Sequence, residues 1–345
     1  MKILILAGGK GTRLWPLCKK SCPKQFVTIY VDPNKHSLFQ KAYLRALKLT
    51  NQENIYVITN KNYVGLVEQQ LLDIHQPVIS DNIIGEIKGK NTLPAILYGV
   101  KIACADGDDN VVVFPSDHKI VDEDTMIEKI KNTEELAQKF IVTFGMTPNT
   151  ANKEYGYICV GEKNQNGFNI KEFKEKPSLK KAKEYVANGY LWNSGIFMFG
   201  SKVFLQEVKK YSNDIYNAIM GNNTLEECYS KIKAGISVDY GVMEHTQLAT
   251  VVPLNVDWSD LGGFDAFYTA FKGDRNNNIC RQDVITLNSK NNLIITEHSE
   301  KVVIIGLNNI IAVERNGVLM LCKKGESYRI KEVVEQLEEE NSTLL

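Results

Sequence analysis

Short apolar runs alternate with amphipathic stretches along the first 270 residues. Apolar runs of about four to eight residues predict buried strands, and apolar residues spaced three or four apart predict helices. We expect strands at residues 3–7, 54–59, 82–87, 110–114, 141–145, 155–160, 167–175, 192–199 and 249–253. Helices are expected at residues 38–50, 63–72, 91–105, 123–139, 179–188, 203–210, 225–232 and 264–271, with another after residues 237–243. This alternation predicts an α/β fold whose parallel sheet is covered by helices on both faces.

The pattern changes after about residue 275, where short β-rich pieces replace the alternation. These pieces lie at residues 284–287, 293–296, 302–305, 310–313 and 318–322, and a helix is expected at residues 330–340. Their spacing is too irregular to establish an internal repeat. We therefore predict two domains, a large α/β domain at residues 1–275 and a small β-rich domain at residues 276–345 that ends in a helix.

The composition excludes several classes of protein. Of the 345 residues 43% are hydrophobic, which is enough for a large core. Lysine plus arginine and aspartate plus glutamate number 41 each, and no basic block is present, which argues against nucleic-acid binding. No apolar run approaches the ~18 residues of a membrane span. Seven scattered cysteines form no CxxC pair, which indicates reduced thiols in a cytoplasmic protein rather than a disulfide or zinc framework.

A glycine-rich turn follows the first predicted strand. Gly8, Gly9 and Gly11 come directly after the apolar run at residues 3–7. Such a turn lets a ligand approach the backbone and directs N–H groups at an anion. Arg13 and Lys24 flank the turn, and both are suited to phosphate. The spacing differs from the GxxxxGK[ST] of a P-loop and from the GxGxxG of a dinucleotide site, so we expect a nucleotide triphosphate bound in another way.

The wider string carries a resemblance to a known family. Residues 6–17 (LAGGKGTRLWPL) followed by residues 23–26 (PKQF) resemble the signature of sugar-1-phosphate nucleotidylyltransferases. The Gln-Phe after Pro-Lys is similar to the mannose-1-phosphate guanylyltransferase branch. The resemblance implies a Rossmann-like domain with a mixed, mostly parallel sheet and a small β-helix-like module, often used for dimer contact. A homodimer is therefore expected. Some bacterial relatives carry an isomerase barrel after about residue 340, whereas this sequence stops there, so only the transferase is expected.

The implied reaction joins mannose 1-phosphate to the α-phosphorus of GTP and releases pyrophosphate. A sugar phosphate is already a nucleophile at neutral pH, so positioning and electrostatics carry the catalysis. The resemblance assigns Arg13 to the leaving β- and γ-phosphates and Lys24 to the α-phosphate. It implies Mg²⁺ held by Asp117, in Pro-Ser-Asp-His, and by Asp260, in Trp-Ser-Asp-Leu-Gly, together with substrate phosphates.

Contacts to the nucleotide are implied for the glycine turn, for strand ends and for the family's Glu-x-x-x-Arg-Asn-Thr-Ala-Pro-Ala motif. These residues are Leu6, Ala7, Gly8, Gly9, Gly11, Thr12, Glu86, Asn91, Pro115 and Ser116. Glu86 is expected to select guanine, because a carboxylate accepts from the adjacent N1–H and N2–H₂ donors. Two residues depart from the motif: Lys90 stands for Arg and Leu93 for Ala. Lysine keeps the charge but loses the bidentate fork.

Three further motifs are implied to bind the sugar phosphate. Lys176 would hold the phosphate, Glu175 would accept from sugar hydroxyls, and Asn193 would contact a hydroxyl. Tyr155 and Gly156 would bring backbone against the sugar, where a side chain at position 156 would interfere. Residues 237–244 (SVDYGVME) also fit the branch, but we leave them outside the catalytic set because their Asp-Tyr can serve packing.

Two alternatives stay open. The first is a guanylyltransferase for another sugar 1-phosphate, such as a heptose or fucose. The second is a regulatory paralogue that binds nucleotide sugar without catalysis, for which the presence of Arg13, Lys24 and both aspartates is unfavourable.

Overall fold

The computed structural model describes residues 1–9, 11–28, 35–280, 284–297 and 301–345. Its contacts divide the chain into two compact units. Unit 1 comprises Met1–Gly8, Ala42–Ser116 and Val121–Val256, and unit 2 comprises Gly9–Lys41, Asp117–Ile120 and Asp257–Leu345. The chain therefore leaves unit 1 immediately after Gly8 and again after Ser116.

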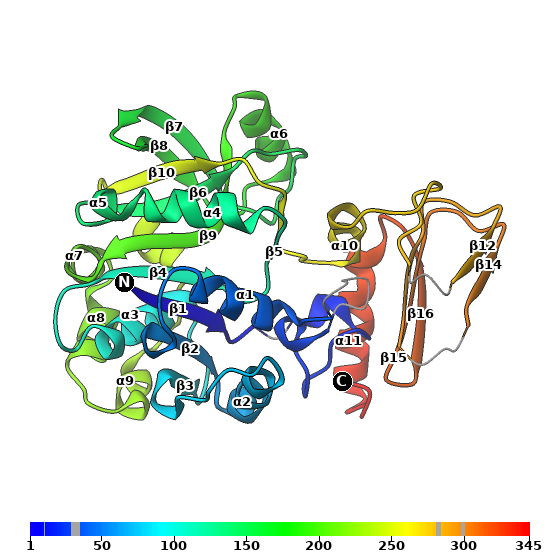
Figure 1. Ribbon diagram of the computed structural model, residues 1–345, viewed down its shortest axis with the longest axis horizontal. Coiled ribbons are helices and arrows are strands. Elements are labelled where there is room, and N and C mark those ends of the chain that lie inside the picture. The colour runs from blue at the N-terminus through cyan, green and yellow to red at the C-terminus, as the bar shows by residue number, and fades with distance from the viewer. Residues whose placement is uncertain (10, 29–34, 281–283, 298–300) are drawn as a thin grey trace. The chain divides into compact units, whose positions relative to one another are not determined.

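A nine-stranded sheet forms the centre of unit 1, in the order β3-β2-β1-β4-β9-β6-β10-β8-β7 (Figure 1). Its ladders make β8 and β9 antiparallel to the other strands, which confirms the expected mixed, mostly parallel sheet. The strands are β1 (Lys2–Ala7), β2 (Ile55–Asn60), β3 (Ile83–Glu86), β4 (Asn110–Pro115), β6 (Ile141–Met146), β7 (Tyr157–Asn164), β8 (Gly167–Lys174), β9 (Leu191–Gly200) and β10 (Ala249–Leu254).

The helices of unit 1 agree with the predicted pattern in most places. They are α2 (Val64–Asp73), α3 (Thr92–Ala103), α4 (Glu123–Lys131), α5 (Glu134–Ala137), α6 (Leu179–Ala187), α7 (Ser201–Tyr211), α8 (Asn213–Met220) and α9 (Leu225–Lys231), with a π-helix, η6, at Asp239–Met243; α1 (Leu38–Leu47) begins in unit 2 and continues in unit 1. The single helix predicted at residues 123–139 is divided into α4 and α5. The hydroxyl of Thr133 donates to the carbonyl of Lys129 at 2.6 Å, a side-chain bond that competes with the helical ladder. Helix α8 was not predicted, although Ile215, Ala218 and Ile219 lie on one buried face.

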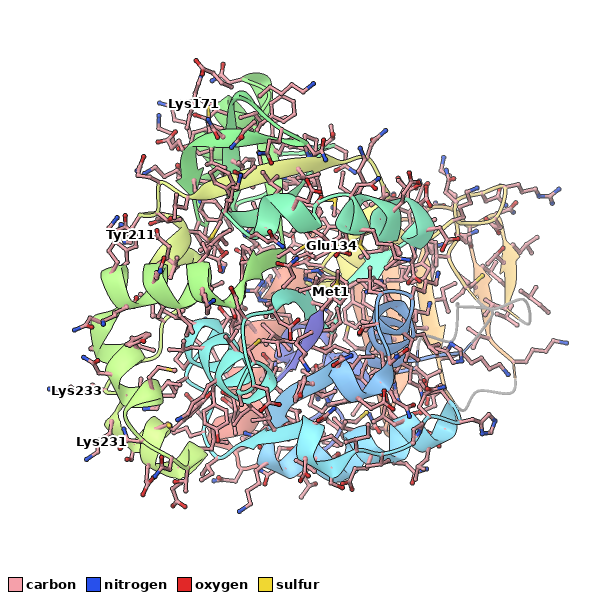
Figure 2. All side chains as sticks on the ribbon, turned by 60° about the vertical axis from the view of Figure 1, so that its left-hand side comes forward. Met1, Glu134, Lys171, Tyr211, Lys231 and Lys233 are labelled. Atoms are coloured by element: carbon pink, nitrogen blue, oxygen red, sulfur yellow. The ribbon has the colours of Figure 1, made fainter. Side chains whose placement is uncertain are left out.

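Charged side chains occupy the outside of unit 1. Figure 2 shows Lys171 on β8 and Lys231 and Lys233 at the end of α9 pointing away from the ribbon. All three are exposed, so they do not disturb the apolar core beneath them.

Helix α3 is apolar on nearly all sides because it lies between the sheet and α8. A β-carbon added to Gly99 would come within 2.8 Å of the Ile58 side chain and 2.9 Å of the Leu4 side chain. Glycine therefore lets the helix approach β1 and β2 closely. This packing fixes the start of α3 at the carboxyl edge of the sheet, where the nucleotide residues were predicted.

Unit 2 contains the short strands of the C-terminal region. Strand β12 (Ile285–Leu287) pairs in parallel with β14 (Val303–Ile305), and β13 (Leu293–Thr296), β15 (Ile310–Arg315) and β16 (Val318–Lys323) form a second sheet. A third pair joins β5 (Lys119–Ile120) to β11 (Trp258–Ser259), and the helices are α10 (Phe264–Ala270) and α11 (Ile330–Glu339). All of the predicted β-rich pieces therefore correspond to strands.

The core of unit 2 joins the N-terminal loop to this β-rich region. Leu14 and Leu17 pack in one buried cluster with Leu293 and Val313. The Trp15 indole N–H donates to the carbonyl of Leu344 at 3.0 Å. The segment that contains the glycine turn and Lys24 thus depends for its packing on residues some 300 positions later in the chain.

Candidate functional site

Strands β1 and β4 are neighbours in the sheet, but the chain passes from β1 to β2 and β3 on one side before it reaches β4 on the other side. The order of the connections therefore reverses between β1 and β4. Ligands of open α/β sheets bind beyond the carboxyl ends of strands at such a switch point. Leu6 pairs with Pro115, and the Ser116 N–H donates to the Leu6 carbonyl at 3.1 Å. This edge of unit 1 therefore brings together the predicted nucleotide residues Leu6, Ala7, Gly8, Pro115 and Ser116.

Glu86 ends β3 at the same edge and is only 5% exposed. The Tyr229 hydroxyl donates to its Oε1 at 2.6 Å. Its Oε2 lies beside Gly8, where an added β-carbon would stand 3.2 Å from that oxygen. Burial raises the pKa of Glu86, while the bond from Tyr229 lowers it, and the net direction is upward. The carboxylate is thus held in a fixed orientation next to the glycine that opens the turn.

Asn91 begins α3 with a positive φ of 72° and accepts the Thr92 N–H on its side chain. Lys90, one of the two departures from the family motif, donates its ammonium to the Ile232 carbonyl at 2.8 Å. A β-carbon at Gly235 would stand 2.1 Å from the Lys90 carbonyl, so the two backbones touch there. A single carbonyl needs only one ammonium donor, so a lysine can serve at position 90 without the two parallel N–H donors of an arginine.

In unit 2 the turn after Gly9 is closed by Lys24. Gly11 has φ 62°, and a β-carbon on it would stand 2.5 Å from Cβ of Lys24, so no other residue fits without strain. The Gln25 amide donates to the Gly9 carbonyl at 3.0 Å. Thr12 and Arg13 lie on the short helix η1 (Thr12–Leu14) and are exposed. The turn therefore places the Arg13 side chain toward solvent and buries Lys24.

The Lys24 ammonium connects the two predicted metal-binding aspartates. It donates to Oδ2 of Asp117 at 2.7 Å and to the backbone carbonyl of Asp260. The antiparallel pairing of β5 with β11 accounts for this, because Asp117 precedes β5 and Asp260 follows β11. Burial by itself raises the pKa of Asp117, but the Lys24 ammonium and His118 outweigh it, and the net pKa is lowered. Asp117 is therefore an ionised carboxylate at neutral pH.

Two neighbours orient these carboxylates. The Trp258 indole donates to Nδ1 of His118 at 3.2 Å, which leaves Nε2 of His118 3.8 Å from Oδ1 of Asp117. Oδ1 of Asp260 accepts the N–H of Gly262 at 3.0 Å. Among the described residues no group of three or more His, Cys, Asp or Glu side chains could form a complete metal cage. A Mg²⁺ ion typically takes few protein carboxylates and several phosphate or water oxygens, so the two aspartate side chains would be enough protein ligands for one.

The predicted sugar residues form a separate cluster in unit 1. The Lys176 ammonium lies 2.9 Å from Oε1 of Glu175. Oε2 of Glu175 is buried and has no hydrogen-bond partner among the described residues. It lies against Gly156, where an added β-carbon would stand 2.4 Å from Oε2. Burial and the nearby Asp239 carboxylate raise the pKa of Glu175 to about 7.

Asn193, on β9, also lies against Gly156. Its Nδ2 donates to Oδ1 of Asp239 at 2.9 Å, and its Oδ1 accepts the Thr143 hydroxyl at 2.9 Å. The Asn193 N–H in turn donates to the Gly156 carbonyl at 2.9 Å. The ring of Tyr155 packs edge-on against Trp192, with ring centroids 4.9 Å apart. The structure thus brings Gly156, Glu175 and Asn193 together around one buried acceptor.

Comparison with known proteins decides the family. The model of the nucleotidyl transferase family matches residues 2–277, most of the chain. The chain belongs to this family. The model of the MannoseP isomerase/GMP-like beta-helix domain matches residues 282–337. The predicted resemblance to nucleotidylyltransferases and the β-helix-like C-terminal module are therefore confirmed.

Individual relatives cover nearly the whole of the chain. Mannose-1-phosphate guanylyltransferase of Salmonella muenchen is 37% identical over 98% of this chain and 73% of its own length. Alginate biosynthesis protein AlgA of Pseudomonas syringae pv. tomato is 34% identical over 99% of this chain and 72% of its own. The crystal structure of mannose-1-phosphate geranyltransferase from Thermus thermophilus is 26% identical and covers 98% of this chain and 99% of that one, with a TM-score of 0.87.

The nucleotidyltransferase site is thus described in two groups of residues. Unit 1 holds the strand-edge, Glu86, Asn91 and sugar residues, and unit 2 holds Gly9, Gly11, Thr12, Arg13, Lys24 and the two aspartates. The sequence did not identify Tyr229 as a partner of Glu86 or Trp258 as a partner of His118. It did offer a signal for Asp239, in the SVDYGVME motif. In the described part of the chain no helix is long and apolar enough to cross a membrane.

Proposed function

We propose that this nucleotidyltransferase transfers GMP from GTP to mannose 1-phosphate, giving GDP-mannose and pyrophosphate. The similarity to a mannose-1-phosphate guanylyltransferase over 98% of the chain is the observation that carries the proposal. Two features of the site support it. Glu86 offers carboxylate oxygens to the two donors of guanine, and Glu175 offers a buried oxygen, without a partner among the described residues, to a sugar hydroxyl.

In the proposed reaction an oxygen of the sugar phosphate forms a bond to the α-phosphorus of GTP while the bond to the pyrophosphate oxygen breaks. The nucleophile is an anion and needs no general base, so the protein must hold two anionic substrates together. We assign Lys24 to the α-phosphate, Arg13 to the departing pyrophosphate and Lys176 to the phosphate of the sugar. Each cation offsets negative charge that would otherwise keep the two substrates apart.

We further propose that Asp117 and Asp260 hold Mg²⁺, which would neutralise charge on the nucleotide phosphates when bound. The ionised state of Asp117 supports this assignment, and Lys24 Nζ contacts both residues, Asp117 through its carboxylate and Asp260 through its backbone carbonyl. With Mg²⁺ bound, Asp117 would hold the metal and the Lys24 ammonium would be available to the α-phosphate. Lys24 and the aspartates are thus expected to act as a linked set.

The assembly and location of the protein are also proposals. Ile285, Leu287, Val303 and Ile305 form register pairs across β12 and β14, and all are at least 46% exposed. Such an apolar face suits contact with a second copy, in line with the expected homodimer.

We keep the two-domain division at about residue 275. The seven cysteines all lie in the described part of the chain and none of them forms a disulfide, which favours the reducing cytoplasm.

The test is a panel assay. Purified protein is incubated with Mg²⁺, one sugar 1-phosphate and one nucleoside triphosphate, and pyrophosphate and nucleotide sugar are both quantified. We expect the highest kcat/KM for mannose 1-phosphate with GTP. A preference for a heptose or fucose 1-phosphate would correct the sugar, and absence of product with every pair, together with binding of GDP-mannose, would favour a regulatory protein.

A further inference from the structure

The Asn193 amide can present only one free group to a ligand. An asparagine amide has two acceptor sites on its oxygen and two N–H donors. Oδ1 accepts from the Thr143 hydroxyl at 2.9 Å and from the Gly195 N–H at 3.2 Å, and Nδ2 donates one hydrogen to Asp239 at 2.9 Å. One N–H is left. The Gly195 N–H, which can only donate, and the Asp239 carboxylate fix which end of the amide is oxygen.

Nδ2 of Asn193, which carries that N–H, lies against Gly156, and so does Oε2 of Glu175, the buried oxygen with no partner among the described residues. An added β-carbon at Gly156 would stand 3.5 Å from Nδ2 of Asn193 and 2.4 Å from Oε2 of Glu175. The glycine therefore lets both side chains approach its backbone closely, so that one donor and one acceptor lie near each other. A sugar hydroxyl complements such a pair, because it accepts one hydrogen bond and donates another.

A single turn of helix holds both Asn193, the donor, and Glu175, the acceptor. In η6 the chain makes a π-type turn, and the Glu244 N–H donates to the Asp239 carbonyl at 2.9 Å. Residues five apart therefore lie on the same side. The Asp239 side chain holds Asn193, and Oε1 of Glu244 accepts the Glu175 N–H at 3.1 Å. A standard α-helical turn would separate the two carboxylates around the helix axis.

The turn is itself fixed to the start of α3. The Val238 N–H donates to the Thr92 hydroxyl at 3.0 Å, and the Leu93 N–H donates to the Ile236 carbonyl at 3.1 Å. The Ser212 hydroxyl donates to the Gly241 carbonyl at 2.9 Å. Asp239 is thus placed by the fold before any substrate arrives.

We propose that Asp239 is a positioning residue of the sugar site, which orients the Asn193 amide as a donor and, with Glu244 on the same turn, aligns it with Glu175. This inference rests on the proposed function. Asp239 contacts no substrate in this account and acts through Asn193. It therefore controls how well the site binds its sugar phosphate and how strictly it selects among sugars.

The test compares Asp239→Ala, Asp239→Asn and the control Asp106→Ala, an exposed loop aspartate of the same unit. Loss of a hydrogen bond to a charged group should raise KM for mannose 1-phosphate about 10- to 100-fold in Asp239→Ala, with KM for GTP unchanged. Asparagine at 239 keeps an acceptor for Nδ2 and should restore most of the affinity. Thr143→Val, which frees the other end of the amide, should raise the same KM and serves if Asp239→Ala does not fold.

A double-mutant cycle tests whether Asp239 acts through Asn193. The cycle is measured at a pH well above 7, where Glu175 is ionised in every variant. In the Asn193→Ala background, Asp239→Ala should then have no further effect on KM, since the positioned group is already absent. Additive effects would overturn the proposal, as would an unchanged KM in Asp239→Ala. If the wild-type protein is active on mannose 1-phosphate, these results refute only the positioning role; if the wild type is inactive on every sugar 1-phosphate, the proposed function fails as well.

The pH profile gives a reading that a merely structural residue would not change. Glu175 faces Asp239, Lys176 and Glu244, and its pKa is about 7 because of burial and the Asp239 charge. Asp239→Asn removes that negative charge and should lower the pKa of Glu175. The acidic limb of kcat/KM for mannose 1-phosphate should then move to lower pH. A limb that stays at the wild-type pH would count against the assignment.

Discussion

Replacement of Glu86 tests how guanine is selected. Glu86 is buried at the end of β3, and the Tyr229 hydroxyl orients it from one side. Guanine offers N1–H and N2–H₂, and each hydrogen bond to a charged acceptor contributes roughly 1.5–3 kcal/mol, or about 10- to 150-fold. Glu86→Ala should lower kcat/KM for GTP by at least the effect of one such bond. Inosine triphosphate lacks the 2-amino group, so its kcat/KM should fall less.

The informative quantity is the ratio of kcat/KM for GTP to that for ITP, measured by pyrophosphate release at saturating mannose 1-phosphate. We expect the ratio to fall about 10-fold or more in Glu86→Ala and in Glu86→Gln. An unchanged ratio would refute the reasoning and assign the 2-amino group to other residues.

Glu86→Gln also separates selectivity from folding. Because the pKa of Glu86 is raised in the folded protein, ionisation of this carboxyl lowers the free energy of unfolding as pH rises through that pKa. Glutamine does not ionise, so the glutamine variant should unfold at an equal or higher temperature at pH 7.

Tyr229→Phe provides a matched control for the same pocket. The variant keeps the aromatic ring and removes only the hydrogen bond to Oε1 of Glu86. In the wild type this hydrogen bond lowers the pKa of Glu86. The pKa of Glu86 should therefore rise in this variant. The carboxylate is lost as pH falls through that pKa, so the acidic limb of kcat/KM for GTP should move to higher pH.

Three further predictions concern unit 2. Lys24→Ala should lower kcat about 10²–10³-fold and weaken the dependence on Mg²⁺, as measured by metal titration, and a near wild-type rate in the folded variant would contradict the role of Lys24. Gly11→Ala should destabilise by ~1–3 kcal/mol in thermal unfolding because of its positive φ and the overlap with Lys24, whereas Gly9→Ala, whose added β-carbon meets nothing within 4 Å, should change stability little. Truncation at residue 275 should give an aggregating protein, because Leu14 and other apolar residues of the N-terminal loop lose their cover; a soluble, active product would disprove this dependence.

Most strands could be predicted from the sequence because a buried parallel strand is apolar on both faces and leaves a local signal. The glycine turn was recognisable for a similar reason, since its conformation excludes other residues at Gly11. The break between α4 and α5 left no such signal. It depends on the hydroxyl of Thr133 bonding to its own helix, and a sequence pattern does not show which way a hydroxyl turns.

The partners of the site residues were harder to predict, because they come from distant parts of the chain. Tyr229 meets Glu86 across 143 positions, and Trp258 meets His118 across 140. Neither pair has a spacing that a helix or strand would produce. The aspartates were found only because family motifs surround them. That β5 and β11 bring them to one ammonium is a property of tertiary pairing rather than of local sequence.

The segment from Tyr229 to Glu244 gives the departure at position 90 a physical meaning. At its start Tyr229 orients Glu86, and at its end Asp239 and Glu244 hold Asn193 and the Glu175 backbone. Between them, Lys90 binds the Ile232 carbonyl. One continuous segment therefore supports both the residue proposed to select the base and those proposed to select the sugar, and Lys90 binds this segment between the two. It follows that Lys90→Met should alter KM for both substrates at once, whereas a lysine that contacted only phosphate would affect the two unequally.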